Sequence, residues 1–231
     1  MRSAKTSPNE IIVTIDGPAG AGKTSVSKLM AGKLGYRYLD TGALYRAVAV
    51  AAIDADVASD DDTALSVLCR DISVDLQESD DGLRVLLNGD DVTNRIRTPQ
   101  ISMMASAVSA RPVVREFLLA TQRTLGGQKG VVAEGRDMGT VVFPDAEAKF
   151  FLEADAGIRA QRRHAELMSG KDEGPSLAAV EKDMQLRDKN DSSRQIAPLQ
   201  PAADAILIDS THLTLDEVVE KMLNHISKLP K

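Results

Sequence analysis

The chain has 231 residues, of which 43% are hydrophobic, so it is long and apolar enough to bury the core of an α/β domain. Its 28 basic and 34 acidic residues give a formal net charge of −6, which disfavours a general nucleic-acid or anionic-membrane surface. A single cysteine excludes an internal disulfide, and the three scattered histidines have no metal-ligand spacing. With no signal peptide and no apolar run of about 20 residues, we expect a cytoplasmic protein that binds neither nucleic acid nor a membrane.

Short apolar runs alternate with amphipathic helical patterns along the chain, after an N-terminal tail of residues 1–10 that we expect to be flexible. The runs predict buried strands at residues 11–15, 36–39, 131–133, 149–152 and 205–208. The helical patterns cover residues 24–34, 44–55, 113–125, 158–168, 177–187 and 215–226. This alternation predicts an α/β fold in which helices cover a doubly wound, five-stranded parallel sheet.

Two segments depart from the alternation. Ile72, Val74 and Leu76 alternate with polar residues, the period of a half-buried antiparallel strand, and Ser79-Asp80-Asp81-Gly82 supplies a turn. Residues 72–92 therefore predict a small antiparallel β insert that is separate from the parallel sheet. Residues 170–199 are rich in charges and turn residues, which predicts a mobile lid over a site.

The segment after the first predicted strand matches the pattern G-x-x-x-x-G-K-[ST]. Glycines and small residues let successive backbone N–H groups curl around an anion, and the positive end of the next helix points to the same place. The lysine can place its charge on the outer phosphates, and the following hydroxyl can hold Mg²⁺. The sequence thus predicts an ATP-type triphosphate site, with Mg²⁺ held at Thr24, formed by Gly17, Pro18, Ala19, Gly20, Ala21, Gly22, Lys23, Thr24 and Ser25.

A phosphate-binding loop alone is compatible with a kinase, a hydrolytic switch or a motor protein. A GTPase switch needs D-x-x-G and N-K-x-D elements, and the sequence contains neither. A nucleic-acid motor would need a longer chain and a basic track. The remaining signals are arginine-bearing segments.

Two of these segments directly follow predicted strands. Leu39-Asp-Thr-Gly-Ala-Leu-Tyr-Arg46 could present a hydroxyl and a guanidinium group to a second phosphate, although a capped helix with a surface arginine is the favoured interpretation of this segment taken alone. Glu134-Gly-Arg-Asp-Met-Gly-Thr140 lies at the carboxyl edge of the sheet, where ligands of open α/β sheets bind. Packing does not account for an arginine and an aspartate at that edge, so this segment favours function.

A third group of arginines lies within one predicted helix. Arg159, Arg162 and Arg163 have the spacing i, i+3 and i+4, which puts all three on one helix face. Three like charges on one face call for an anion. A solvated face relieved by Glu166 is the alternative, and the spacing leaves both open.

Taken together, these motifs resemble those of bacterial cytidylate (CMP) kinases over residues 11–223. The resemblance rests on the loop, on Leu39–Arg46 and on Gly135-Arg-Asp-Met-Gly-Thr-Val-Val-Phe-Pro144. It also rests on Asp91-Val-Thr-Asn-Arg-Ile-Arg-Thr98, Arg194-Gln-Ile-Ala-Pro-Leu199 and Asp204-Ala-Ile-Leu-Ile-Asp-Ser-Thr211. It implies transfer of the γ-phosphoryl group of ATP to CMP or dCMP with Mg²⁺. It also implies one P-loop kinase domain at 11–231, with a core (11–40, 112–155, 200–228), a monophosphate-binding region with the β insert (41–111) and a lid (170–199). Apart from the resemblance, we expect the chain to be a monomer.

The resemblance also assigns residues. It implies CMP contacts at Thr41, Arg46, Ser106, Arg115, Arg136, Asp137, Arg187, Asp191 and Arg194, and a catalytic set of Lys23, Arg136, Arg159, Arg162, Arg163 and Arg187. Three positions depart from the family pattern: Lys189 and Ser192 replace arginines of the lid, and Glu134 stands where many relatives carry aspartate. A kinase for another nucleoside monophosphate and a nucleotide-gated switch protein are the alternatives.

Overall fold

The computed structural model describes residues 10–79, 82–169 and 173–230. The expected tail at residues 1–9, the middle of the expected turn at residues 80–81, and residues 170–172 of the expected lid lie outside this range. The chain divides into two compact units: Met1–Leu39, Gly126–Ser193 and Ala197–Lys231 form the first, and Asp40–Leu125 and Arg194–Ile196 form the second. None of the helices in the described ranges is long and apolar enough to cross a membrane.

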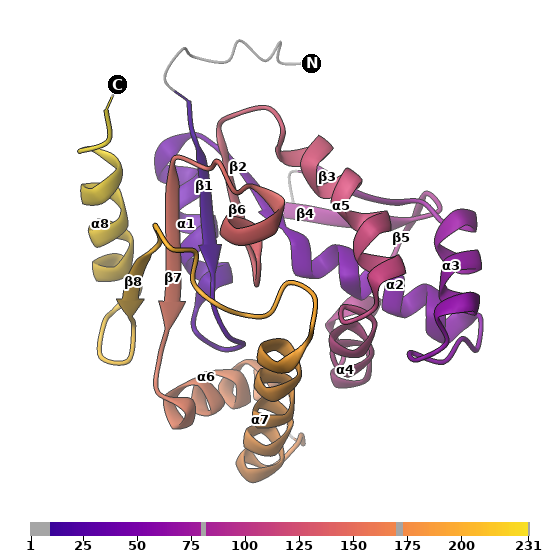
Figure 1. Cartoon of the computed structure of the whole chain (residues 1–231). Coiled ribbons are helices and arrows are strands. Elements are labelled where there is room, and N and C mark those ends of the chain that lie inside the picture. The colour runs from indigo at the N-terminus through magenta and orange to yellow at the C-terminus, as the bar shows by residue number, and fades with distance from the viewer. Residues whose placement is uncertain (1–9, 80–81, 170–172, 231) are drawn as a thin grey trace. The chain divides into compact units, whose positions relative to one another are not determined.

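A five-stranded sheet organises the first unit, in the strand order β2-β6-β1-β7-β8. Strand β1 pairs in parallel with both β6 and β7, and β7 pairs in parallel with β8. All five strands lie where the apolar runs predicted them, so the doubly wound parallel sheet is confirmed (Figure 1). Their bounds are β1 Ile12–Asp16, β2 Arg37–Asp40, β6 Val131–Gly135, β7 Ala148–Glu153 and β8 Ile206–Asp209.

The register of the sheet brings two predicted loops to one edge. Asp16, the last residue of β1, lies opposite Gly135, the last residue of β6. The glycine-rich loop that follows Asp16 and the segment that carries Arg136 therefore leave the sheet side by side. This is the carboxyl edge at which parallel sheets bind ligands.

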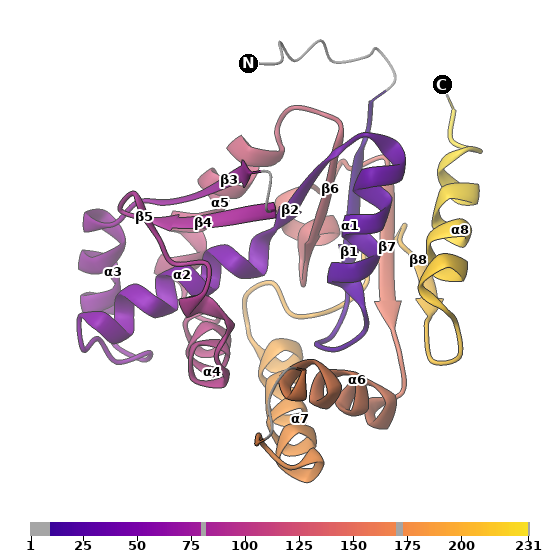
Figure 2. The same cartoon turned by 180° about the vertical axis from the view of Figure 1, so that it is seen from behind.

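Helices α1 (Lys23–Leu34) and α8 (Leu215–Ile226) lie side by side against this sheet (Figures 1 and 2). Helix α8 begins with a capping box: Thr214 accepts from the backbone of Glu217, and the Glu217 side chain accepts from the backbone N–H of Thr214. The buried side chains of both helices, such as Met30 and Met222, pack against sheet residues that include Phe150. This packing forms the hydrophobic core of the unit.

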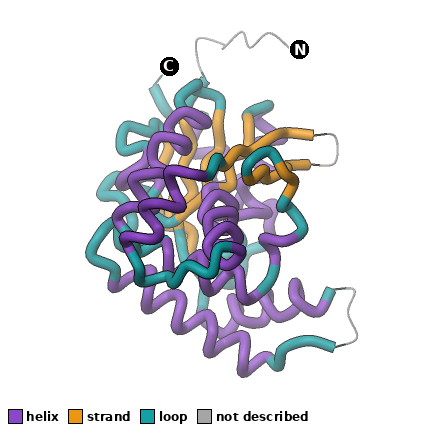
Figure 3. Tube along the Cα trace, turned by 90° about the vertical axis from the view of Figure 1, so that its right-hand side faces the viewer, coloured by secondary structure: helices purple, strands orange, loops and turns teal. Residues whose placement is uncertain are grey.

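Helices α6 (Ala156–Met168) and α7 (Leu177–Ser193) form a second pair in the first unit (Figure 3). The sequence pattern predicted that the second of these helices ends at residue 187, and it treated residues 170–199 as largely irregular. The structure corrects this, because α7 continues through Ser193. The apolar periodicity does not extend into residues 188–193, because all six are polar. In the structure the inward-facing residue of this last turn is the buried Asp191.

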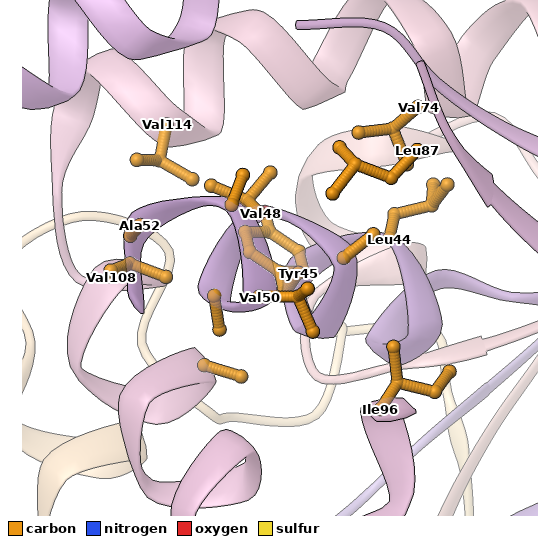
Figure 4. Close-up of a cluster of buried hydrophobic side chains, with 14 of the residues drawn as sticks. Leu44, Tyr45, Val48, Val50, Ala52, Val74, Leu87, Ile96, Val108 and Val114 are labelled. Atoms are coloured by element: carbon orange, nitrogen blue, oxygen red, sulfur yellow. The ribbon is translucent and has the colours of Figure 1, made fainter. Parts of the chain in front are cut away.

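The second unit is built around α2 (Thr41–Asp54). This helix buries side chains on most of its circumference, as expected for a central helix (Figure 4). Its neighbours are α3 (Asp62–Asp71), α4 (Pro99–Val108) and a small antiparallel sheet. Helix α5 (Pro112–Gly126) contributes Val114 and Leu118 to the same buried cluster. The sheet consists of β3 (Val74–Ser79), β4 (Gly82–Leu87) and β5 (Asp90–Asp91), which confirms the predicted insert and adds a short third strand.

Sequence periodicity missed two helices of this unit, α3 and α4, although both begin with recognisable caps. Asp61 accepts from the backbone of Ala64 at the start of α3. Thr98 accepts from the backbone of Ile101 at the start of α4, where Pro99 occupies the first turn. Both helices are only 10 residues long, too short for the apolar period alone to reveal them.

Candidate active site

The glycine-rich loop connects β1 to α1, as the motif requires. Gly17 has φ +146° and Gly20 has φ +73°, conformations that other residues rarely adopt. A Cβ atom on Gly17 would lie 2.0 Å from the backbone oxygen of Leu152, and one on Gly20 would lie 2.8 Å from that of Arg159. The glycines are therefore needed both for the turn of the backbone and for its close packing.

Lys23 begins α1 and is 7% exposed. Its Nζ donates a hydrogen bond to the backbone oxygen of Pro18 at 2.7 Å, so the side chain folds back over the loop. Burial lowers the pKa of Lys23 to about 7; the charge of Arg136 lowers it as well, against the opposing charges of Glu134 and Asp16. A charged lysine at this position therefore lacks full compensation within the protein, and an anion in the loop would supply it.

Thr24 and Glu134 place two oxygen-bearing side chains beside the loop. Thr24 Oγ1 donates to Glu134 Oε1 at 2.8 Å, and the hydroxyl of Tyr38 donates to the same carboxylate oxygen. Glu134 is the fourth residue of β6 and is 4% exposed. A hydroxyl and a carboxylate are the oxygen donors that Mg²⁺ prefers, so this pair fits the cofactor that the sequence predicts.

Asp16 is a buried carboxylate that sequence reasoning did not single out. Its Oδ1 accepts from the backbone N–H of Met138 and its Oδ2 from that of Gly139, both at 2.8 Å. Met138–Val142 forms a π-helical turn, so Asp16 fixes the start of this turn just after Arg136 and Asp137. Burial raises the pKa of Asp16 to about 6, although the two backbone hydrogen bonds act to lower it. The sequence feature that could have pointed to Asp16 is its position as a charged residue at the end of an apolar strand.

Helix α7 contributes two aspartates to the same unit. Asp191 Oδ2 accepts from Arg136 Nε at 2.8 Å, and Asp188 Oδ2 accepts from Arg159 Nη1 at 2.6 Å. Burial opposes the charge of Arg136, but the neighbouring carboxylates, with Asp191 foremost, more than offset this and raise its pKa. Among the predicted site residues of the first unit, Arg136 and Asp191 thus form an ion pair. Arg187, another predicted residue, lies half-buried on α7.

The three arginines of α6 have three different partners within the protein. Arg159 donates to the backbone oxygen of Ala19, and Arg162 donates to both oxygens of Ser210. Arg163 pairs with Glu166 at 2.9 Å, as the alternative of a surface ion pair supposed. Each of the three guanidinium groups is therefore bound by the protein itself.

In the second unit, Asp40 organises the start of α2. Its Oδ1 accepts from the backbone N–H of Ala43, and its Oδ2 lies 3.0 Å from Arg46 Nη2. Arg97 lies 3.8 Å from the same carboxylate, and Thr41 is buried at the first helical position. Asp40 therefore caps α2, as the simpler interpretation of this segment expected, and its carboxylate also binds the guanidinium group of Arg46.

Two further predicted arginines of the second unit meet at Ser109. Arg115 Nη1 donates to the backbone oxygen of Ser109 at 3.2 Å, and Arg194 Nη1 donates to Ser109 Oγ at 3.4 Å. The side chain of Arg115 also lies over the ring of Tyr45, 5.8 Å from its centroid. Ser106 is buried one turn earlier, and its hydroxyl has no hydrogen-bond partner among the described residues.

Comparison with known proteins adds independent findings. The family model described as cytidylate kinase matches residues 13–228. A cytidylate kinase from Geobacter sp. is 50% identical over 93% of this chain and 91% of that one. One from Geobacter sulfurreducens is 49% identical over 92% and 91%, and one from Geobacillus sp. is 44% identical over 95% and 98%. A solved shikimate kinase from Acinetobacter baumannii, in complex with shikimate, is 14% identical at a TM-score of 0.49, over 96% and 97%.

Proposed function

Since this chain belongs to the cytidylate kinase family, we propose that it transfers the γ-phosphoryl group of ATP to CMP or dCMP, giving ADP and the diphosphate. The family match over most of the chain carries this proposal, and the glycine-rich loop with its buried lysine supports it. The same match favours this acceptor over another nucleoside monophosphate, and it favours a kinase over a nucleotide-gated switch.

ATP is assigned to the loop from Gly17 to Ser25. The phosphate of CMP is already an oxyanion, so the reaction needs no general base, and catalysis consists of holding two anions in line. The repulsion between two such anions amounts to several kcal/mol when poorly screened. Lys23, Arg136 and Arg187 are the proposed countercharges.

Mg²⁺ is the proposed cofactor, with Thr24 as the ligand and Glu134 as the carboxylate that orients it. When bound with ATP, the ion supplies charge neutralisation at the phosphates. The hydrogen bond from Thr24 Oγ1 to Glu134 points one lone pair of the hydroxyl away from the carboxylate. Because Tyr38 holds the same oxygen of Glu134, the orientation of the pair is fixed in advance.

CMP is assigned to Thr41, Arg46, Ser106, Arg115, Arg136, Asp137, Arg187, Asp191 and Arg194. The arginines would bind the phosphate, and the polar residues would bind the base and the sugar. An exocyclic amine distinguishes cytosine from uracil, and a buried acceptor left unpaired by uracil would reject UMP. The hydroxyl of Ser106, which has no hydrogen-bond partner within residues 10–79, 82–169 and 173–230, is available for such a contact.

The proposed division of labour follows the chain. Residues 11–40, 112–155 and 200–228 form the core, residues 41–111 bind the monophosphate, and residues 170–199 act as a lid. Closure of the lid would exclude water, which would otherwise take the phosphoryl group. We propose that the chain works as a monomer.

A panel of acceptors tests this function. The protein is incubated with MgATP and CMP, dCMP, UMP, AMP or no acceptor, and ADP is measured by a coupled assay. ADP formation with CMP and dCMP, and little with the other additions, is the expected result. Equal turnover with AMP would indicate another monophosphate kinase, and ADP formation without any acceptor would indicate an ATPase.

A further inference from the structure

The outer side of the glycine-rich loop is bound by side chains that lie far away in the sequence. When backbone N–H groups converge on an anion, the peptide planes turn the carbonyl oxygens outward. In this structure two of the loop's carbonyl oxygens are held from elsewhere in the fold: that of Ala19 accepts from Arg159, and that of Ala21 accepts from Ser210. Ala19 and Ala21 are 8% and 1% exposed, so their carbonyl groups need partners within the protein.

Ser210 reaches the loop from the end of β8. Its Oγ donates to the backbone oxygen of Ala21 at 3.2 Å, and the residue is 3% exposed. Arg162 holds Ser210 in two places, with Nη1 donating to Oγ at 3.1 Å and Nη2 donating to the backbone oxygen at 2.7 Å. The fork of the guanidinium group therefore fixes both the position of Ser210 and the direction of its hydroxyl proton, which is left to point at Ala21.

Arg159 contacts another peptide group of the loop. Its Nη1 donates to the backbone oxygen of Ala19 at 3.0 Å, and its Nε donates to that of Ala154 at 3.0 Å. Asp188 of α7 accepts from the same Nη1 at 2.6 Å and balances its charge. Two arginines of one helix thus reach two peptides of the loop, one directly and one through a serine.

We propose that Arg159, Arg162 and Ser210 are positioning residues that hold the outward carbonyls of Ala19 and Ala21, and thereby keep the inward N–H groups in the geometry that binds the ATP phosphates. This inference replaces the expectation that Arg159 and Arg162 bind phosphate themselves. It rests on the proposed function only in that ATP occupies the loop. A pre-formed cradle binds its anion more tightly, because less ordering remains to be done on binding.

A double-mutant cycle on Arg162 and Ser210 tests the proposal. The dissociation constant of an MgATP analogue is measured by calorimetry without CMP for the wild type, Ser210→Ala, Arg162→Met and the double variant. Each single change is expected to weaken binding by about threefold to tenfold, the range of one hydrogen bond. The dissociation constant of the double variant should not exceed that of the single variant with the lower affinity, because Arg162 reaches Ala21 only through the hydroxyl of Ser210.

Further variants separate positioning from direct contact with phosphate. Arg162→Lys keeps the charge but loses the fork, so it should bind ATP as weakly as Arg162→Met; rescue by lysine would contradict the proposal. The KM for CMP should stay within about twofold of the wild type in all variants that turn over. Arg70→Met and Ser227→Ala, at exposed positions on α3 and after α8, serve as controls.

The outcomes are separable from those of the proposed function. The positioning role would be overturned if the double variant lost ATP affinity by the product of the two single losses, or if Ser210→Ala bound ATP as the wild type does. Either result would count even if the wild type makes CDP. If the wild type fails to make CDP, the binding cycle still reports on the loop. Should Arg162→Met fail to fold, as judged by thermal melting, Ser210→Ala and Arg162→Lys carry the test alone.

Discussion

Asp191 holds Arg136 through a hydrogen bond of 2.8 Å, and both side chains are largely buried in the first unit. The arginine that we assign to the acceptor phosphate is thus oriented by a carboxylate on α7 before any substrate arrives. Nη1 of Arg136 also donates to the backbone oxygen of Gly135 at 3.3 Å. These two contacts fix the direction of the guanidinium group, which has five N–H donors and can therefore also bind another anion.

Removal of Arg136 should therefore impair the use of CMP. We expect Arg136→Gln to lower kcat/KM for CMP by about 30-fold or more, equivalent to at least ~2 kcal/mol, because a buried charge partner of the phosphate is lost. Steady-state kinetics with CMP varied at saturating ATP measure this. Arg70→Gln is the matched control, and a wild-type kcat/KM in Arg136→Gln would disprove the acceptor assignment.

Lys23→Met should abolish transfer and leave the fold intact. The substitution removes the only charge that the loop itself places on the phosphates, and losses of about 100-fold or more in kcat are typical for such groups. Circular dichroism checks the fold and the coupled assay checks turnover. Lys33→Met, in the last turn of the same helix, should remain active. Unchanged turnover in Lys23→Met would exclude the proposed role.

Binding of ATP should be coupled to proton uptake. The pKa of Lys23 is lowered to about 7 in the free protein, and phosphates beside it would raise this value. The free lysine is then about half protonated at pH 7 and about one-tenth protonated at pH 8, so uptake should rise from about 0.5 to about 0.9 protons. ATP affinity should consequently fall as the pH rises above 7. Calorimetry in buffers of different ionisation enthalpy measures the uptake, and none at pH 8 would contradict the expectation.

Glu134→Gln tests the proposed magnesium site. Thr24 and Tyr38 both donate to Oε1 of Glu134, so glutamine can keep both hydrogen bonds while it removes the charge. We expect the Mg²⁺ concentration for half-maximal activity to rise by about 10-fold to 100-fold. A titration of Mg²⁺ at fixed ATP gives this value. A curve that coincides with that of the wild type would show that the carboxylate does not orient the ligand.

Asp16→Asn should release the turn that follows Arg136. One amide oxygen can replace only one of the two carboxylate acceptors, so the N–H of Met138 or Gly139 would lose its partner, at a cost of about 1–3 kcal/mol. The pKa of Asp16 is raised to about 6, so its contribution to wild-type stability is greatest below about pH 4 and is lost as the pH rises through 6. Urea unfolding of both proteins at pH 4.5 and 7 should show a larger deficit of the variant at pH 4.5. If the difference in unfolding free energy between the two proteins were the same at both pH values, the raised pKa of Asp16 would be refuted.

The sequence predicted the parallel sheet well because its strands are continuous apolar runs and its glycine loop has a fixed pattern. The same patterns contain no information about which side chain satisfies which buried backbone group. The contacts of Asp16 with Met138 and of Ser210 with Ala21 join residues more than 100 positions apart. They became visible only with the register of β1 and β6 and the path of the chain after β8.

The arginines of α6 show most clearly how little a sequence pattern predicts about the contacts of long side chains. Their spacing correctly placed them within one helix, but long side chains can turn to different partners. Arg159 bends to Ala19, Arg162 to Ser210 and Arg163 to Glu166. Helical periodicity fixes where the Cβ atoms point, whereas the acceptors that the fold brings near decide where a guanidinium group goes.

The fate of the γ-phosphoryl group is the most direct measure of the central claim, which is that two nucleotide phosphates are held together away from water. Phosphorus NMR of a reaction with MgATP and CMP follows ATP, CDP and inorganic phosphate at once. We predict one CDP formed for each ADP, with no inorganic phosphate beyond the rate without enzyme. Release of inorganic phosphate in place of CDP would contradict the account.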